Sequence, residues 1–227
     1  KLKQTKYSIS NEELRQYFPV NAAINGLFGL AERLYGVRLE LQENVAVWHQ
    51  DVRYYSVHDD GGALIGGFYA DLNARSGKRT GGGVDECVSR KKLNGHATLP
   101  VGYLVCNFPP PDDNARSLLN HDDVVTLFHE FGHMLHHLLT RIDYPSISGI
   151  NGVAWDAVEL PSQFMENWCY HRETLLGLSK HFETGERLPD ALFEKIDAAR
   201  TFRAASQMLR QIYFSSMDLA QIGRAHV

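Results

Sequence analysis

One amphipathic segment constrains the fold of this chain more than any other feature. Between His121 and Thr140, apolar residues recur at spacings of three and four, the spacing of one face of an α-helix. Asp122 and Asp123 suit the positive N-terminal end of such a helix. The apolar stripe consists of Val124, Leu127, Phe128, Phe131, Leu135 and Leu138. We therefore predict a helix that packs this face against the rest of its domain.

The other face of the predicted helix carries His-Glu-Phe-Gly-His at positions 129–133. Side chains at positions i and i+4 of a helix project side by side, so His129 and His133 can reach one cation. Glu130 lies about 100° around the helix from His129, close enough to hold a water molecule without binding the cation itself. Because the apolar stripe is complete without the histidines, packing does not explain them. The pattern indicates one Zn²⁺ per chain, with Glu130 as the catalytic base.

A catalytic zinc needs a third protein ligand and one open position. One known peptidase pattern would place a histidine at position 139, but this chain has Leu139. The alternative is a carboxylate from a downstream helix, where Glu159 and Glu166 are available. Pro161 belongs in the first turn of that helix, which places Glu159 at the helix start near the metal and Glu166 two turns deeper.

Residues beside the metal are expected to orient its histidine ligands. Ligating histidines usually donate their second ring N–H to a carboxylate or carbonyl, and Asp156 or Glu166 could accept it. Asp156 could instead be the N-cap of the downstream helix, with Glu159 completing a capping box. In the first interpretation Glu159 binds the metal, and in the second it belongs to the capping box, so the two interpretations compete for this residue. For His136 and His137, an orienting or solvated role is favoured over metal binding.

Several stretches resemble the thimet oligopeptidase family of zinc peptidases, and within it the bacterial oligopeptidase A branch. The similarity rests on residues 129–133, 148–149 and 155–168, with further similar stretches at 48–53 and 68–72. It covers nearly all of the chain. The resemblance implies Glu159 as the third ligand and a mostly helical, zincin-like α+β fold with a small sheet beside the metal helix. It also implies internal cleavage of short peptides in the cytoplasm.

The remaining sequence indicates helices and strands in the same chain. Helical spacing between residues 11 and 36 predicts two helices. Residues 45–57 and 64–72 are rich in β-branched and aromatic residues and flank a turn, which predicts a hairpin. Residues 101–108 predict a third strand. We expect this strand to be the sheet edge along which an extended peptide docks.

The composition excludes several classes of partner. The net charge is only −4 and the charges are interspersed, so neither nucleic acid nor a membrane surface is indicated. The basic, glycine-rich loop at residues 75–83 lacks the Gly-Lys-Ser/Thr ending of a phosphate-binding loop. Three scattered cysteines favour a reducing compartment. We expect a cytoplasmic monomer that acts on short peptides.

Both ends of the chain look artificial. The chain opens at Lys1 without an initiator methionine, and residues 221–227 resemble a translated sequencing adapter. We therefore expect residues 1–220 to be part of a metallopeptidase catalytic domain and residues 221–227 to be an artificial tail. The family resemblance implies that a histidine and tyrosines that bind substrate lie further downstream. On this basis the isolated chain would bind zinc yet hydrolyse peptides poorly.

Two other functions fit the same residues. A peptide-binding or structural zinc module would need a fourth protein ligand, such as His136 or Cys169, to close the site. A helical interaction domain without metal would leave the histidines incidental. Two histidines and a carboxylate also suit manganese or cobalt.

Overall fold

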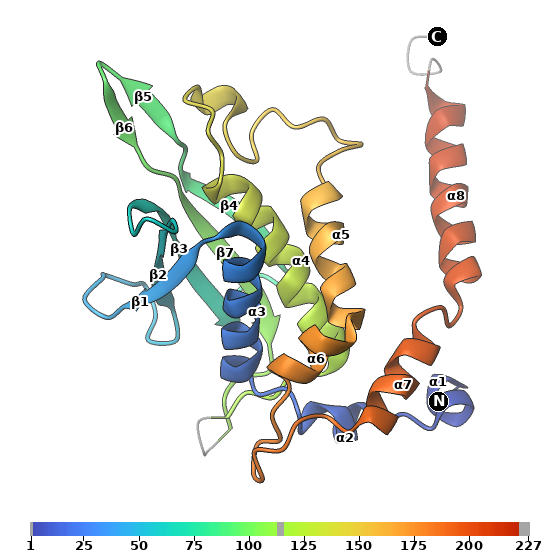
Figure 1. Ribbon diagram of the computed structural model, residues 1–227. Coiled ribbons are helices and arrows are strands. Elements are labelled where there is room, and N and C mark those ends of the chain that lie inside the picture. Colours follow the sequence, from blue (N-terminus) through green and yellow to red (C-terminus); the bar gives the residue numbers. More distant parts are fainter. Residues whose placement is uncertain (1, 113–115, 223–227) are drawn as a thin grey trace. The chain divides into compact units, whose positions relative to one another are not determined.

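The computed structural model describes residues 2–112 and 116–222, which divide into two compact units (Figure 1). Residues 10–189 form the larger unit, and residues 2–9 with 190–222 form the smaller one. The larger unit combines a mixed sheet with helices, which confirms the predicted α+β class. Most of the expected artificial tail, residues 223–227, lies outside the described residues.

A five-stranded sheet forms the framework of the larger unit, with the strand order β1-β2-β3-β7-β4. The predicted hairpin is confirmed as the antiparallel pair β2–β3, and β3 pairs in parallel with β7. A separate pair, β5–β6, forms a small hairpin. The strands are β1 (Arg38–Gln42), β2 (Arg53–His58), β3 (Leu64–Asn73), β4 (Gly83–Val88), β5 (Lys91–Leu93), β6 (His96–Thr98) and β7 (Val101–Phe108).

The prediction that residues 101–108 form the edge of the sheet is wrong. Strand β7 pairs on both sides, with β3 in parallel and with β4 antiparallel. The burial of β7 alternates along its length, because one face packs against helix α4. This alternation describes the faces of the strand and not its edges, which are both filled by neighbouring strands. Within the described ranges β4 pairs with β7 alone, so β4 is the edge strand on this side of the sheet. Its glycine and its two acidic residues have low strand propensity, so the sequence did not indicate this strand.

The helices of the larger unit match the predicted pattern. Two helices occupy residues 11–36, and the predicted metal helix spans His121–Leu138. The larger unit contains α2 (Asn11–Arg15), α3 (Val20–Tyr35), α4 (His121–Leu138), α5 (Leu160–Glu166) and α6 (Arg172–Leu178). The smaller unit contains α1 (Leu2–Tyr7), α7 (Asp190–Ala199) and α8 (Ala204–Gln221). No helix in the described part is long and apolar enough to cross a membrane.

The core of the larger unit lies where α3 and α4 meet one face of the sheet. Phe28 of α3, Phe68 of β3 and Phe131 of α4 pack together, with ring centroids 5.8–6.3 Å apart. Phe68 and Phe131 are fully buried. Because side chains alternate along a strand, the next residue, Tyr69, faces the other side of the sheet and packs against Tyr103. The aromatic core thus holds α4 firmly against the sheet.

Candidate active site

Helix α4 begins with a complete capping box. The Asn120 side chain accepts a hydrogen bond from the Asp123 backbone N–H at 2.8 Å, and the Asp123 carboxylate accepts one from the Asn120 N–H at 2.9 Å. These bonds satisfy two N–H groups that the first turn leaves unpaired. The helix is therefore fixed at its start, roughly two to three and a half turns before the predicted site residues.

Gly132 allows α5 to approach α4 closely. A Cβ atom added at Gly132 would lie 2.4 Å from the Pro161 carbonyl oxygen and 2.6 Å from the Ser162 Cα atom. Pro161 lies in the first turn of α5, as the sequence predicted. Any side chain at position 132 would therefore push away the start of α5, the segment that carries Glu159.

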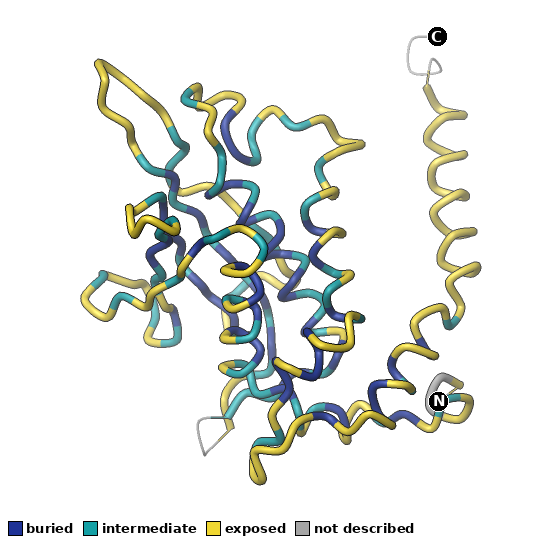
Figure 2. The backbone as a smooth tube through the Cα atoms, viewed as in Figure 1, coloured by how far each residue is buried: buried dark blue, intermediate teal, exposed yellow. Residues whose placement is uncertain are grey.

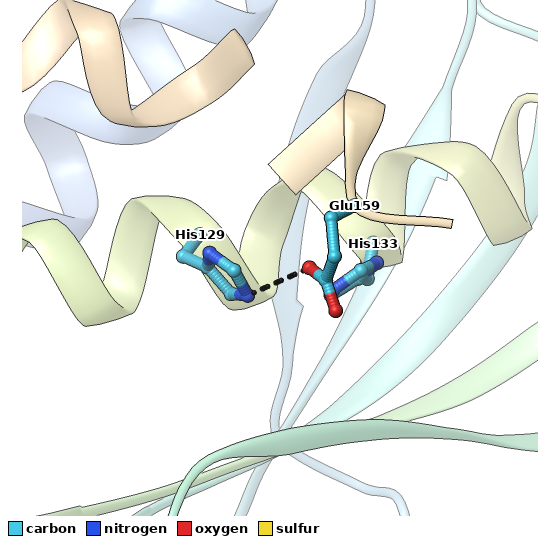
Figure 3. Close-up of side chains that lie close together, drawn as sticks. All are labelled: His129, His133 and Glu159. Carbon is cyan, nitrogen blue, oxygen red and sulfur yellow. Dashed lines mark ion pairs between the residues drawn. The ribbon is translucent and has the colours of Figure 1, made fainter. Parts of the chain in front are cut away.

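The structure brings the three predicted ligands together (Figure 3). One Glu159 carboxylate oxygen lies 3.2 Å from His129 Nε2 and 3.1 Å from His133 Nε2. Figure 3 shows the two rings projecting from α4 toward a carboxylate that comes from the start of α5. The candidate ligand atoms of all three residues lie within 4.8 Å of one another.

The spacing and chemistry of these atoms fit a zinc ion. A tetrahedral ion with bonds of roughly 2.0–2.1 Å keeps its ligand atoms roughly 3.3 Å apart, close to the two observed separations. Two imidazoles and one carboxylate form a common ligand set of catalytic zinc sites. Neither His136 nor Cys169 joins the group of possible ligands. Cys169 is buried and directs its thiol to the Val124 carbonyl. The described residues thus offer three ligands and no fourth that would close the site.

Glu166 and Asp156, the two predicted orienting residues, differ in position. Glu166 Oε1 lies 2.6 Å from His129 Nδ1, on the side of the ring that faces away from Glu159. Asp156 is exposed and forms no hydrogen bond or ion pair with either histidine among the described contacts. Helix α5 begins at Leu160 with Glu159 at the N-cap position, so the alternative that Asp156 caps this helix is wrong.

Ser162 orients Glu159, a contact that the sequence did not predict. Its hydroxyl lies 2.7 Å from Glu159 Oε2 and 2.9 Å from the Glu159 backbone oxygen. This hydrogen bond, helped by attraction to His133 and His129, lowers the pKa of the Glu159 carboxyl. A serine three residues after a glutamate at a helix start is the sequence signal that could have revealed the contact.

Glu130 is buried on the sheet side of α4. A Cβ atom added at Gly82, the residue before β4, would lie 2.6 Å from Glu130 Oε1, so the backbone at the start of β4 runs directly beside this carboxylate. Burial raises the pKa of Glu130, and Glu159 adds to the rise while His129 opposes it. Burial lowers the pKa of His133, which favours the neutral imidazole that binds metals. A carboxylate of raised pKa is suited to exchanging protons near neutral pH.

His137 has a structural position rather than a solvated one. It is fully buried, and its Nε2 atom lies 3.2 Å from the Val88 carbonyl and 3.1 Å from the Val101 carbonyl. Because carbonyl oxygens only accept, Nε2 carries the proton and donates. His137 therefore ties the end of β4 and the start of β7 to α4.

The glycine-rich basic loop is held by internal contacts. Arg75 forms a two-pronged pair with Asp71, at 2.6 and 2.7 Å, and Lys78 Nζ lies 2.9 Å from Asp71 Oδ1. The Lys78 side chain is only 7% exposed. These two cations are paired with Asp71.

Comparison with known proteins assigns the chain to a family. Residues 1–223 match peptidase family M3. Oligopeptidase A of Escherichia coli (strain K12) is 52% identical over 219 residues, covering 96% of this chain and 32% of that protein. Organellar oligopeptidase A of Arabidopsis thaliana is 49% identical over 225 residues, covering 96% of this chain and 28% of that protein. Dipeptidyl carboxypeptidase of Escherichia coli is 35% identical over 219 residues, with coverages of 96% and 32%.

The chain therefore belongs to peptidase family M3, and its fold is the zincin-like α+β fold that the family resemblance implied. It spans about a third of the length of the relatives it matches.

Proposed function

We propose that the protein carrying this chain is a zinc-dependent endopeptidase that hydrolyses short oligopeptides. The observation that carries the proposal is the convergence of His129, His133 and Glu159, with Glu130 beside them but outside the ligand group. A structural zinc site would need a fourth protein ligand, and the described residues supply three. The family membership supports a peptidase.

In the proposed chemistry the ion and Glu130 have separate roles. When bound, zinc supplies the Lewis acidity that polarises a scissile carbonyl and acidifies water. Glu130 accepts the proton of the attacking water and then donates it to the departing amine. Its raised pKa suits both steps, since the group must hold the proton briefly and release it again. Glu166 keeps the His129 ring oriented through its Nδ1 atom.

We further propose that an extended peptide pairs with β4 rather than with β7. Strand β4 has an unpaired edge within the described residues, and Gly82, the residue before it, lies beside Glu130. A peptide added to this edge would form backbone hydrogen bonds that do not depend on its sequence. This docking would bring a scissile bond next to the proposed base.

The cytoplasm is the proposed compartment. Cys87, Cys106 and Cys169 are all free, which supports a reducing environment.

An internally quenched short peptide tests the proposed function. Cleavage by the full-length protein that carries this chain should stop when zinc is chelated and return when zinc is added. Glu130→Gln should retain zinc but lose roughly 100-fold or more in turnover. Glu13→Gln, at an exposed position in α2, is the matched control and should cleave normally. Stoichiometric zinc without any cleavage would instead identify a binding module, and wild-type rates in Glu130→Gln would remove Glu130 from its role.

A further inference from the structure

The pairing of β3 with β7 is interrupted beside the glycine-rich loop. Asp71 pairs with Val105, but Asn73 pairs with Phe108, so β7 has one residue more than β3 across this interval. Backbone carbonyls in such a bulge lose their regular partners and need other donors. The Lys78 ammonium supplies them.

Lys78 Nζ lies 2.8 Å from the Asp71 carbonyl, 2.9 Å from the Asn73 carbonyl and 2.5 Å from the Cys106 carbonyl. The ammonium also pairs with the Asp71 carboxylate, which accepts from Arg75 as well and from Trp48 at 3.1 Å. The three N–H groups of the ammonium are shared among these four acceptors inside the larger unit, so the bulge is a stable feature of the sheet.

In the bulge, Cys106 and Asn107 of β7 lie opposite the single residue Leu72 of β3. The Asn107 side chain reaches the glycine-rich loop. Its amide nitrogen donates to the Arg79 carbonyl at 2.9 Å and also to the Gly81 carbonyl. Carbonyl oxygens only accept, so this amide must present its N–H groups to the loop. Two loop carbonyls, one on each side of Thr80, are thereby fixed to β7.

The loop fixed by Asn107 leads directly to Glu130. Gly82 follows Gly81 and runs beside the Glu130 carboxylate, and β4 begins one residue later. The ladder with β7 places β4 from Gly83 onward. The Asn107 hydrogen bonds therefore set where the residues just before β4 lie relative to Glu130. Arg75 and Lys78 hold the first half of the loop through Asp71. The second half depends on Asn107, because Arg79 and Thr80 are exposed and Gly81 adopts a positive φ angle.

We propose that Asn107 is a positioning residue for peptide hydrolysis. It holds the residues before β4 so that a peptide paired with this strand is aligned with Glu130. This inference rests on the proposed function, but the placement of the loop can be measured without any activity. Asn107 touches neither the ligand group nor Glu130, so removing its amide leaves zinc binding intact.

Asn107→Asp and Asn107→Ala test the inference in the full-length protein. The aspartate keeps the shape of the side chain and removes both donors, and the alanine removes the side chain without adding charge. Asn44→Asp, at an exposed turn position, is the control for the added charge. Three quantities are measured: tryptic cleavage after Arg79 together with amide exchange of residues 81–84, zinc affinity, and kcat separately from KM for the quenched peptide.

Both Asn107 variants should be cut after Arg79 roughly tenfold faster or more, because two hydrogen bonds that close the loop are lost. Zinc affinity should stay unchanged, and kcat should fall roughly 10- to 100-fold with a smaller change in KM. Unchanged loop cleavage and exchange in Asn107→Ala would overturn the inference, as would a mobile loop with wild-type kcat. A wild-type protein that binds zinc but cleaves nothing would refute the proposed function, while loop cleavage and exchange would still report whether Asn107 fixes the loop.

Discussion

Helices α4 and α8 are both 18 residues long and amphipathic, yet they differ completely in burial (Figure 2). Helix α4 buries eleven residues between the sheet and α5, whereas no residue of α8 is buried. Large apolar side chains such as Met208, Ile212 and Phe214 stay exposed on α8. The same kind of sequence pattern thus gives a packed helix in one unit and an uncovered helix in the other.

The difference shows what an amphipathic pattern can and cannot specify. The pattern predicts that a segment is helical and which face is apolar, but packing against other elements supplies most of a helix's stability. Helix α4 has those partners, and they also place Glu159 and Glu166 beside its histidines. The chemistry of α4 therefore depends on its neighbours as much as on its own sequence.

The largest expected contrast comes from removing one phenylalanine from each helix. Phe131→Ala should lower the free energy of unfolding by about 3–5 kcal/mol, because it leaves a cavity beside Phe28 and Phe68. Phe214→Ala should change it by less than about 0.5 kcal/mol, because Phe214 is 43% exposed. Urea unfolding of the chain measures both. Equal losses would contradict the assignment of α8 as uncovered.

A glycine-to-alanine pair tests how closely α4 meets its neighbour. Gly132→Ala should destabilise by about 1–3 kcal/mol, because its Cβ would overlap the Pro161 carbonyl. Gly29→Ala in α3 should stabilise by up to about 1 kcal/mol, because nothing lies within 4 Å of the added atom. Thermal unfolding gives the signs, and zinc titration should show weaker binding for Gly132→Ala alone. A stabilised Gly132→Ala variant would mean that α5 lies further away.

The contact between α4 and the end of α5 is tested through zinc affinity. Glu166→Gln should weaken zinc binding roughly 10- to 100-fold, because the acceptor that orients His129 loses its charge. Asp156→Asn should leave the affinity unchanged, since Asp156 makes no such contact. Competition with a chelating dye measures both variants, and the reverse ranking would make Asp156 the orienting residue.

Lowering the pH should destabilise the larger unit, because Asp71 becomes protonated, and should leave α8 unaffected. Burial alone would raise the pKa of Asp71, but hydrogen bonds from Arg75, Lys78 and Trp48 outweigh it and lower the pKa to about 2. A carboxyl whose pKa is lower in the folded state stabilises above its unfolded pKa, so this contribution is lost as the pH falls from about 4 to about 2.

The loss should amount to at most about 2 kcal/mol in the free energy of unfolding. Urea midpoints measured between these pH values should fall more steeply for the wild type than for Asp71→Asn, although that variant is less stable at neutral pH. Parallel slopes would show that Asp71 titrates normally in the folded protein.

The sequence was most informative where residues act over one or two helical turns. The spacing of His129 and His133, the helix that carries them and the position of Pro161 all follow from helical geometry. Position in the sequence narrowed the third ligand to two candidates, Glu159 and Glu166. Choosing between them needed the family resemblance. Local periodicity predicts which face of a helix a residue occupies. It does not predict which carboxylate from a distant segment contacts that face.

The order of strands was not predictable in this way. The period of two identifies residues 101–108 as a strand, but it carries no information on whether one or both edges are paired. The strand that fills its other edge, β4, begins at the last of three consecutive glycines and has no apolar alternation. The Lys78 and Asn107 contacts were missed for the same reason, since both join segments more than 25 residues apart.

Zinc coordination by the 227-residue chain tests the central claim most directly. X-ray absorption of the purified, zinc-loaded chain should show one ion per chain with two imidazole nitrogens and carboxylate or water oxygens at roughly 2.0–2.1 Å, and no sulfur. His133→Ala should abolish this spectrum, and Glu159→Gln should weaken binding. A chain that takes up no zinc, or a zinc ion bound through Cys169 or unaffected by the loss of His133, would contradict the account.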